Sequence, residues 1–117
     1  MLKMDKRSEL IERLESLRSE VIDAEQAVFV AYNDVQDVKI ELQTREDDIL
    51  LDRAEGIKID GKNAEIRAAQ IRAATDYERL AVREEEYALE AKKLALDGLK
   101  TELRINLALV ELVKGVA

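Results

Sequence analysis

The stretch LIERLESLRSEVIDAEQAVFVAYNDVQDVKIEL, residues 10–42, decides the fold of this chain because its apolar residues recur in alternating steps of four and three. The series continues to Ile49, and Arg45 alone interrupts it. Its members are Leu10, Leu14, Leu17, Val21, Ala24, Val28, Ala31, Val35, Val38, Leu42 and Ile49. A 3.5-residue repeat of this length is typical of a helix that packs along a second helix in a left-handed coiled coil. We therefore predict one long helix over about residues 5–54.

A break in the helical pattern follows in AEGIKIDGKN, residues 54–63, which holds two of the four glycines. Gly56 suits the left-handed position just beyond a helix end, and either Asp60 or Asn63 suits the N-cap of the next helix. We expect a turn over about residues 55–62 and a second helix over about residues 63–114. A connection this short favours a second helix that folds back along the first. The predicted fold class is all-α, with residues 1–117 forming a single antiparallel coiled-coil hairpin.

The distribution of charge supports the antiparallel direction. Residues 41–60 hold seven acids and three bases, whereas residues 62–83 hold five bases and three acids. These two stretches lie side by side in an antiparallel hairpin, so opposite charges face each other. Each exposed pair contributes only about 0.2–1 kcal/mol, but the pairs act together.

Two apolar stripes run along the predicted second helix, and one of them must face the first helix. A turn near residue 58 pairs each residue of the second helix with its mirror position on the first, which predicts a facing stripe of Ile66, Gln70, Ala73, Tyr77, Leu80, Glu84, Tyr87, Ala91, Leu94, Gly98, Thr101 and Ile105. Large residues of one helix then fall opposite small residues of the other. Interdigitated packing requires such an alternation of size. In this arrangement Gln70 meets Arg45, while Glu84 has no partner.

The other stripe is left for a partner. Val82, Leu89, Leu96, Leu103 and Val110 recur every seven residues, and Leu99, Leu107 and Val113 broaden the stripe. The first helix adds a smaller apolar surplus at Ile22, Phe29 and Val30. Large apolar patches mark interaction sites, so we predict a homo-oligomer, most simply a two-fold dimer that forms a four-helix bundle. A different protein partner, or cover by the chain's own ends, is the alternative.

The composition excludes most catalytic machinery. The chain has no His and no Cys, which removes the usual general base and the thiolate nucleophile. No phosphate-binding glycine loop is present. We therefore expect no enzyme activity and no catalytic, cofactor or metal site.

The net charge of −7 argues against direct nucleic-acid binding. No apolar run approaches the length of a membrane-spanning helix, and the start MLKMDKRSEL has no apolar core of a secretory signal. We therefore expect a cytoplasmic protein that does not bind membranes.

Clustered carboxylates leave two alternative functions open. Glu9, Glu12, Glu20 and Asp23 form ExxE and ExxD spacings that resemble those of helical, magnesium-dependent nucleotide pyrophosphohydrolases. In those enzymes the two motifs lie on separate helices, whereas here both fall on one helix. The acidic stretch over residues 41–60, at the tip of the hairpin, suggests instead an acidic mimic of nucleic acid that inhibits a DNA- or RNA-binding enzyme.

The segment DGKNAEIRAAQIRAATDYERL, residues 60–80, resembles small helical proteins encoded by bacteriophages and prophages. The similarity rests on a turn of Gly61, Lys62 and Asn63 that opens a long charged helix. It implies a coiled-coil protein and assigns no catalytic residue. It makes Gly61, Lys62 and Asn63 a candidate signature site, and the alternative is that these residues only cap the helix.

Overall fold

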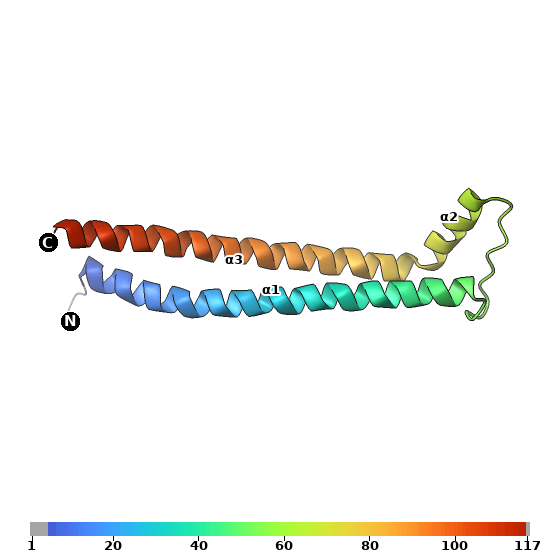
Figure 1. The fold of residues 1–117 in the computed structure, drawn as a ribbon, viewed down its shortest axis with the longest axis horizontal. Helices are drawn as coiled ribbons and strands as arrows, with labels where there is room; N and C mark the ends of the chain where they lie inside the picture. Colours follow the sequence, from blue (N-terminus) through green and yellow to red (C-terminus); the bar gives the residue numbers. More distant parts are fainter. Residues whose placement is uncertain (1–4, 117) are drawn as a thin grey trace. The chain divides into compact units, whose positions relative to one another are not determined.

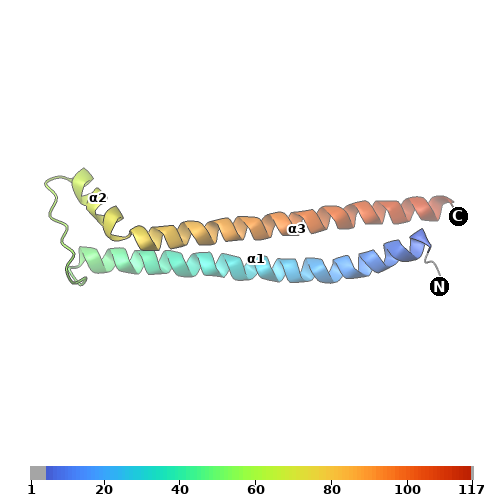
Figure 2. The ribbon, with the colours of Figure 1, turned by 180° about the vertical axis from the view of Figure 1, so that it is seen from behind.

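The computed structural model describes residues 5–116 and is all-α over this range. It contains the helices α1 (Lys6–Leu50), α2 (Ala64–Ala74) and α3 (Asp76–Val116). The long helices α1 and α3 pack antiparallel, as predicted, and lie side by side in both views (Figures 1 and 2). The chain divides into two compact units, one of Met1–Val30 with Glu90–Ala117 and one of Ala31–Leu89. We call them the terminal unit and the central unit.

The predicted seam of α1 is confirmed in both units. Leu17 is fully buried in the terminal unit, and Ala31, Val35 and Ile49 are buried in the central unit. The other seam residues are partly buried, and so is Arg45. The core of each unit is therefore a single row of side chains between two helices, which buries few residues completely.

The first helix begins where the sequence predicts. The backbone N–H of Ser8 donates to a side-chain oxygen of Asp5 at 2.7 Å, so Asp5 acts as the N-cap. This hydrogen bond from the Ser8 backbone is the main reason that the pKa of Asp5 lies below its ordinary value.

The end of α1 differs from the prediction. Helix α1 stops at Leu50, and Asp52, with φ 57°, occupies the left-handed position that we assigned to Gly56. The Arg53 N–H donates to the Asp48 carbonyl at 2.7 Å, and the Asp52 N–H donates to the Ile49 carbonyl at 3.2 Å. These two bonds form a Schellman motif. It satisfies the free carbonyls at the helix end, so the helix ends without a glycine.

The prediction of one uninterrupted second helix is wrong. Helix α2 ends at Ala74, and α3 begins at Asp76, after Thr75. The fully buried Thr75 leaves helical geometry, and its hydroxyl donates to the Ile71 carbonyl at 2.8 Å. In the central unit, α2 turns away from α3 at this residue (Figures 1 and 2). The sequence TDYE, residues 75–78, has the spacing of a helix-starting capping box, a signal that would have predicted this boundary.

Within residues 5–116, none of the helices combines the length and the apolar character needed to cross a lipid bilayer.

Candidate interaction surface

Six of the residues predicted to form an oligomer interface lie on the packed side of α3. They are Val82 and Leu89 in the central unit and Leu96, Leu99, Leu103 and Val110 in the terminal unit, and we call them the inner stripe. Leu89 is 8% exposed, and the other five are partly buried. Since α1 runs alongside α3 in each unit, this burial identifies the inner stripe as the intrachain seam. Our choice between the two stripes of the second helix was therefore wrong.

The stripe that we expected to face the first helix is exposed instead. In the terminal unit its predicted members are Ala91, Leu94, Gly98, Thr101 and Ile105, and the same spacing continues to Ala108 and Leu112. We call these seven exposed residues the outer stripe, and Leu94 is 71% exposed. In the central unit the same spacing falls on Tyr77, Leu80, Glu84 and Tyr87, which are also exposed. The inner stripe is wholly aliphatic and gains most from leaving water. A carboxylate, two tyrosine hydroxyls and a threonine hydroxyl are better satisfied on the exposed side.

The remaining residues of the predicted interface are exposed. Leu107 and Val113 lie near the end of α3, and Ile22, Phe29 and Val30 lie on α1, all in the terminal unit. Ile22 and Phe29 are seven residues apart, so they share one side of α1. This unit therefore exposes apolar side chains on both of its helices.

Arg13 links the two helices of the terminal unit. Its Nε and Nη2 donate to the two carboxylate oxygens of Glu102 at 2.7 and 2.8 Å, and its Nη1 donates to Glu20 at 2.7 Å. A bidentate pair of this kind fixes direction as well as distance. The hydrogen bond with Glu102 raises the pKa of Arg13 above its ordinary value, and the same bond lowers the pKa of Glu102. Glu20, one carboxylate of the enzyme-like cluster, is thus already held by an arginine.

Three ion pairs cross between the helices of the central unit. Arg79 Nη2 lies 2.7 Å from Glu46, while Arg45–Glu78 and Lys39–Glu86 are separated by 3.8 Å. Only the Arg79–Glu46 pair joins an acid of residues 41–60 to a base of residues 62–83, as predicted; in the other two pairs the base lies on α1 and the acid on α3. The Arg79–Glu46 pair also neutralises part of the acidic stretch on which the nucleic-acid mimic depends.

The polar residue in the α1 seam has a different partner from the one we predicted. Arg45 lies near Glu78, whereas Gln70 lies near the turn. The Arg45 Nε is buried, and it makes no hydrogen bond among residues 5–116. Its contact with Glu78 at 3.8 Å therefore compensates the charge without a close hydrogen bond.

The candidate signature turn has a defined structural role at Gly61. Its N–H donates to Gln70 Oε1 at 2.9 Å, and its carbonyl accepts from Arg67 Nη1 at 3.1 Å. Gln70 Nε2 also donates to Asp60 at 2.8 Å. A Cβ atom at Gly61 would lie 2.6 Å from Ile66 Cγ2, so this close approach requires a glycine.

The other two signature residues lie at the start of α2. Asn63 is the N-cap, and its side chain accepts from the Ile66 N–H at 2.9 Å. Lys62 is exposed. The contacts of this turn are those of a helix cap, and Asn63, not Asp60, provides it.

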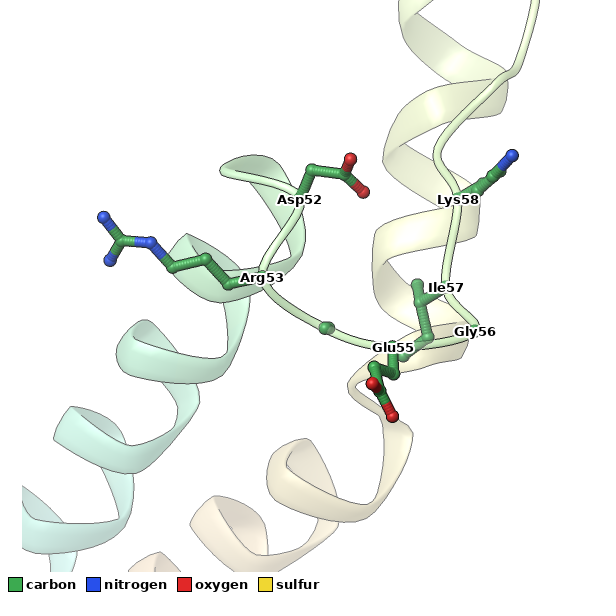
Figure 3. A pocket seen from close by; sticks show the side chains of 7 residues that line it. Asp52, Arg53, Glu55, Gly56, Ile57 and Lys58 are labelled. Atoms are coloured by element: carbon green, nitrogen blue, oxygen red, sulfur yellow. The ribbon is translucent and has the colours of Figure 1, made fainter.

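The central unit has several hollows in its surface. The one at residues 52–58 is lined by a single loop, and Figure 3 shows its two cations, Arg53 and Lys58, pointing away from each other. No group of three metal-ligating side chains occurs within the part of the chain that the structure describes. The exposed apolar residues and the charges beside them form the candidate recognition surface.

Comparisons of the chain with protein-family models, with characterised proteins and with solved structures found no match.

Proposed function

We propose that this protein is a non-catalytic interaction module that self-associates through the exposed side of α3. The observation that carries the proposal is the outer stripe, where Leu94, Ile105 and Leu112 are exposed on one side of a continuous helix. Exposure of this row to water is unfavourable, because full burial of a leucine or isoleucine side chain contributes about 1.5–3 kcal/mol of stabilising free energy.

The small core of each unit supports the same proposal. Only Leu17 and Thr75 have side chains with almost no exposed surface among the described residues. A two-helix arrangement offers no third layer to cover the outside of α3. Pairing with α3 of a second chain would supply that layer. Because the outer stripe lies opposite the inner stripe on α3, the four helices would then lie in a row and not in the four-helix bundle expected from the sequence. A symmetric dimer is the simplest such assembly.

The other functions that the sequence left open have less support. The acidic mimic would need unpaired carboxylates, whereas Glu46 and Glu78 lie beside arginines. The carboxylate enzyme would need a metal-binding group, and Glu20 is bound by Arg13. A phage or prophage origin stays a prediction that rests on the resemblance alone.

Light scattering after gel filtration tests self-association directly. We expect a mass of two chains for the wild type and a fall towards one chain in Leu94→Glu. Phe29→Glu is the matched control, because Phe29 is 66% exposed, lies in the same unit and places the same charge on α1 instead. A CD spectrum of each variant is recorded to check that the chain remains helical.

Two results would contradict the proposal. A wild-type mass of one chain across the accessible concentrations would remove self-association altogether, and a different protein would then be the remaining occupant of the surface. An oligomer that survives Leu94→Glu but is lost in Phe29→Glu would place the contact on α1 and not on α3.

A further inference from the structure

Among residues 5–116, no contact near Gly98 requires a glycine at this position. Gly98 lies in the middle of α3 and on the outer stripe, and a Cβ atom placed there would have no neighbour within 4 Å. Glycine weakens a helix interior relative to alanine, so an interior glycine with open space beside it suggests a close approach by something outside the chain. Its neighbours on the same side of α3 also have small side chains, namely Ala91, Thr101 and Ala108, so another helix can approach the backbone closely here.

A charged row borders the outer stripe. Glu90, Asp97 and Arg104 are exposed and recur every seven residues, each one position before a member of the stripe. Arg104 makes no ion pair among residues 5–116. Glu90 pairs with Lys93 of its own helix at 3.4 Å, but its side chain remains largely exposed. Along α3 the row therefore has two acidic residues followed by one basic residue, so its two ends carry opposite charges.

From these features we infer that two copies of this chain pair through antiparallel α3 helices, about a two-fold axis beside Asp97. The inference rests on the proposed self-association and adds its direction and register. In this register Leu94 of each chain packs into the space at Gly98 of the other. The same register places Glu90 of each chain opposite Arg104 of the other.

Packing favours the antiparallel direction over the parallel one. In a parallel pair each residue of the stripe meets its own copy, so Leu94 meets Leu94 and Gly98 meets Gly98. The glycine layer would then leave a void, which close-packed interiors avoid. The antiparallel register alternates large and small residues in both symmetry-related layers.

Charge favours the same direction. The antiparallel pair forms two symmetric Glu90–Arg104 contacts, whereas a parallel pair would bring Asp97 towards Glu102 on the other border of the stripe. One unfavourable contact remains in the antiparallel pair, because Asp97 of each chain meets its own copy at the axis. Removal of the Asp97 charge should therefore strengthen the dimer, which provides a further test of the register.

Charge reversal tests the pairing, with the dissociation constant measured by analytical ultracentrifugation. We expect Glu90→Arg and Arg104→Glu each to weaken the dimer about tenfold, because both symmetric contacts become repulsive. The double variant restores both contacts and should regain wild-type affinity. Lys100→Glu, an exposed α3 residue away from the stripe, is the matched control and should have little effect. Asp97→Asn should bind more tightly than the wild type.

Cross-linking tests the direction independently, because the natural chain has no cysteine. A mixture of Leu94→Cys and Gly98→Cys chains should form mixed disulfides in preference to disulfides between identical chains. Preferential linkage of Gly98→Cys to itself, or a double charge variant as weak as the single ones, would overturn the antiparallel register while leaving self-association intact. A wild-type chain that is monomeric would instead overturn the proposed function and this inference together.

Discussion

The difference between the two stripes of α3 can be measured with a pair of leucine variants. Leu89 is 8% exposed and Leu94 is 71% exposed, although they lie five residues apart on one helix. Full burial of a leucine contributes about 1.5–3 kcal/mol. We therefore expect Leu89→Ala to lower the free energy of unfolding by about 2 kcal/mol, with more if a cavity remains. Leu94→Ala removes a side chain with less than a third of its surface covered, so its effect within one chain should be under about 0.9 kcal/mol.

Urea unfolding followed by CD at 222 nm provides the assay. With a slope of about 2 kcal/mol per molar urea, Leu89→Ala should lower the midpoint by about 1 M and Leu94→Ala by about 0.3 M. The comparison is made at a protein concentration low enough for the chain to be monomeric. It is then repeated at high concentration, where the effect of Leu94→Ala should grow because association stabilises the folded state.

Equal midpoint shifts for the two variants in dilute solution would refute this reasoning. They would mean that the side of α3 carrying Leu94 is covered within the single chain. A larger loss of unfolding free energy in Leu94→Ala than in Leu89→Ala would mean that the stripe carrying Leu94 faces α1, as the sequence had suggested.

Three further changes test the turns and the helix-linking ion pair. Asp52→Gly should stabilise the chain by about 1 kcal/mol in thermal melts, because glycine adopts a positive φ without strain and the change removes an acid from a helix C-terminus. Asp52→Ala is the control, because alanine keeps the Cβ atom, and it should give no such gain. Gly61→Ala should destabilise the chain by about 1–3 kcal/mol in the same melts, since its Cβ would lie 2.6 Å from Ile66 Cγ2. Arg13 holds the pKa of Glu102 below its ordinary value, so this pair stabilises the fold above the pKa of an unfolded glutamate. That stability is lost as the pH falls through the folded-state pKa, and urea midpoints measured between pH 7 and pH 3 should therefore fall less in Glu102→Gln than in the wild type.

The α1 helix could be predicted closely because one residue series dominates it. Leu17, Val35 and Ile49 belong to a single 3.5-residue repeat, and no second stripe of comparable length competes with it. The antiparallel direction could also be predicted, and the cap was narrowed to Asp60 or Asn63, because these features depend on charge and on local residue types. The end of α1 could not be predicted, because the left-handed residue at the helix end is Asp52, while Gly56 has a positive φ four residues further along the chain.

The side of α3 that faces α1 was decided only by the tertiary structure. Both of its stripes have the spacing of a coiled-coil seam, so periodicity alone cannot choose between them. Our choice assumed an uninterrupted second helix whose residues mirror those of the first about residue 58, but Thr75 interrupts the helix and α3 begins anew at Asp76. The sequence alone determines that α3 has two apolar sides. Which side is buried depends on the packing of α3 against α1, where the aliphatic inner stripe loses more by contact with water than a stripe containing Glu84 and Gly98.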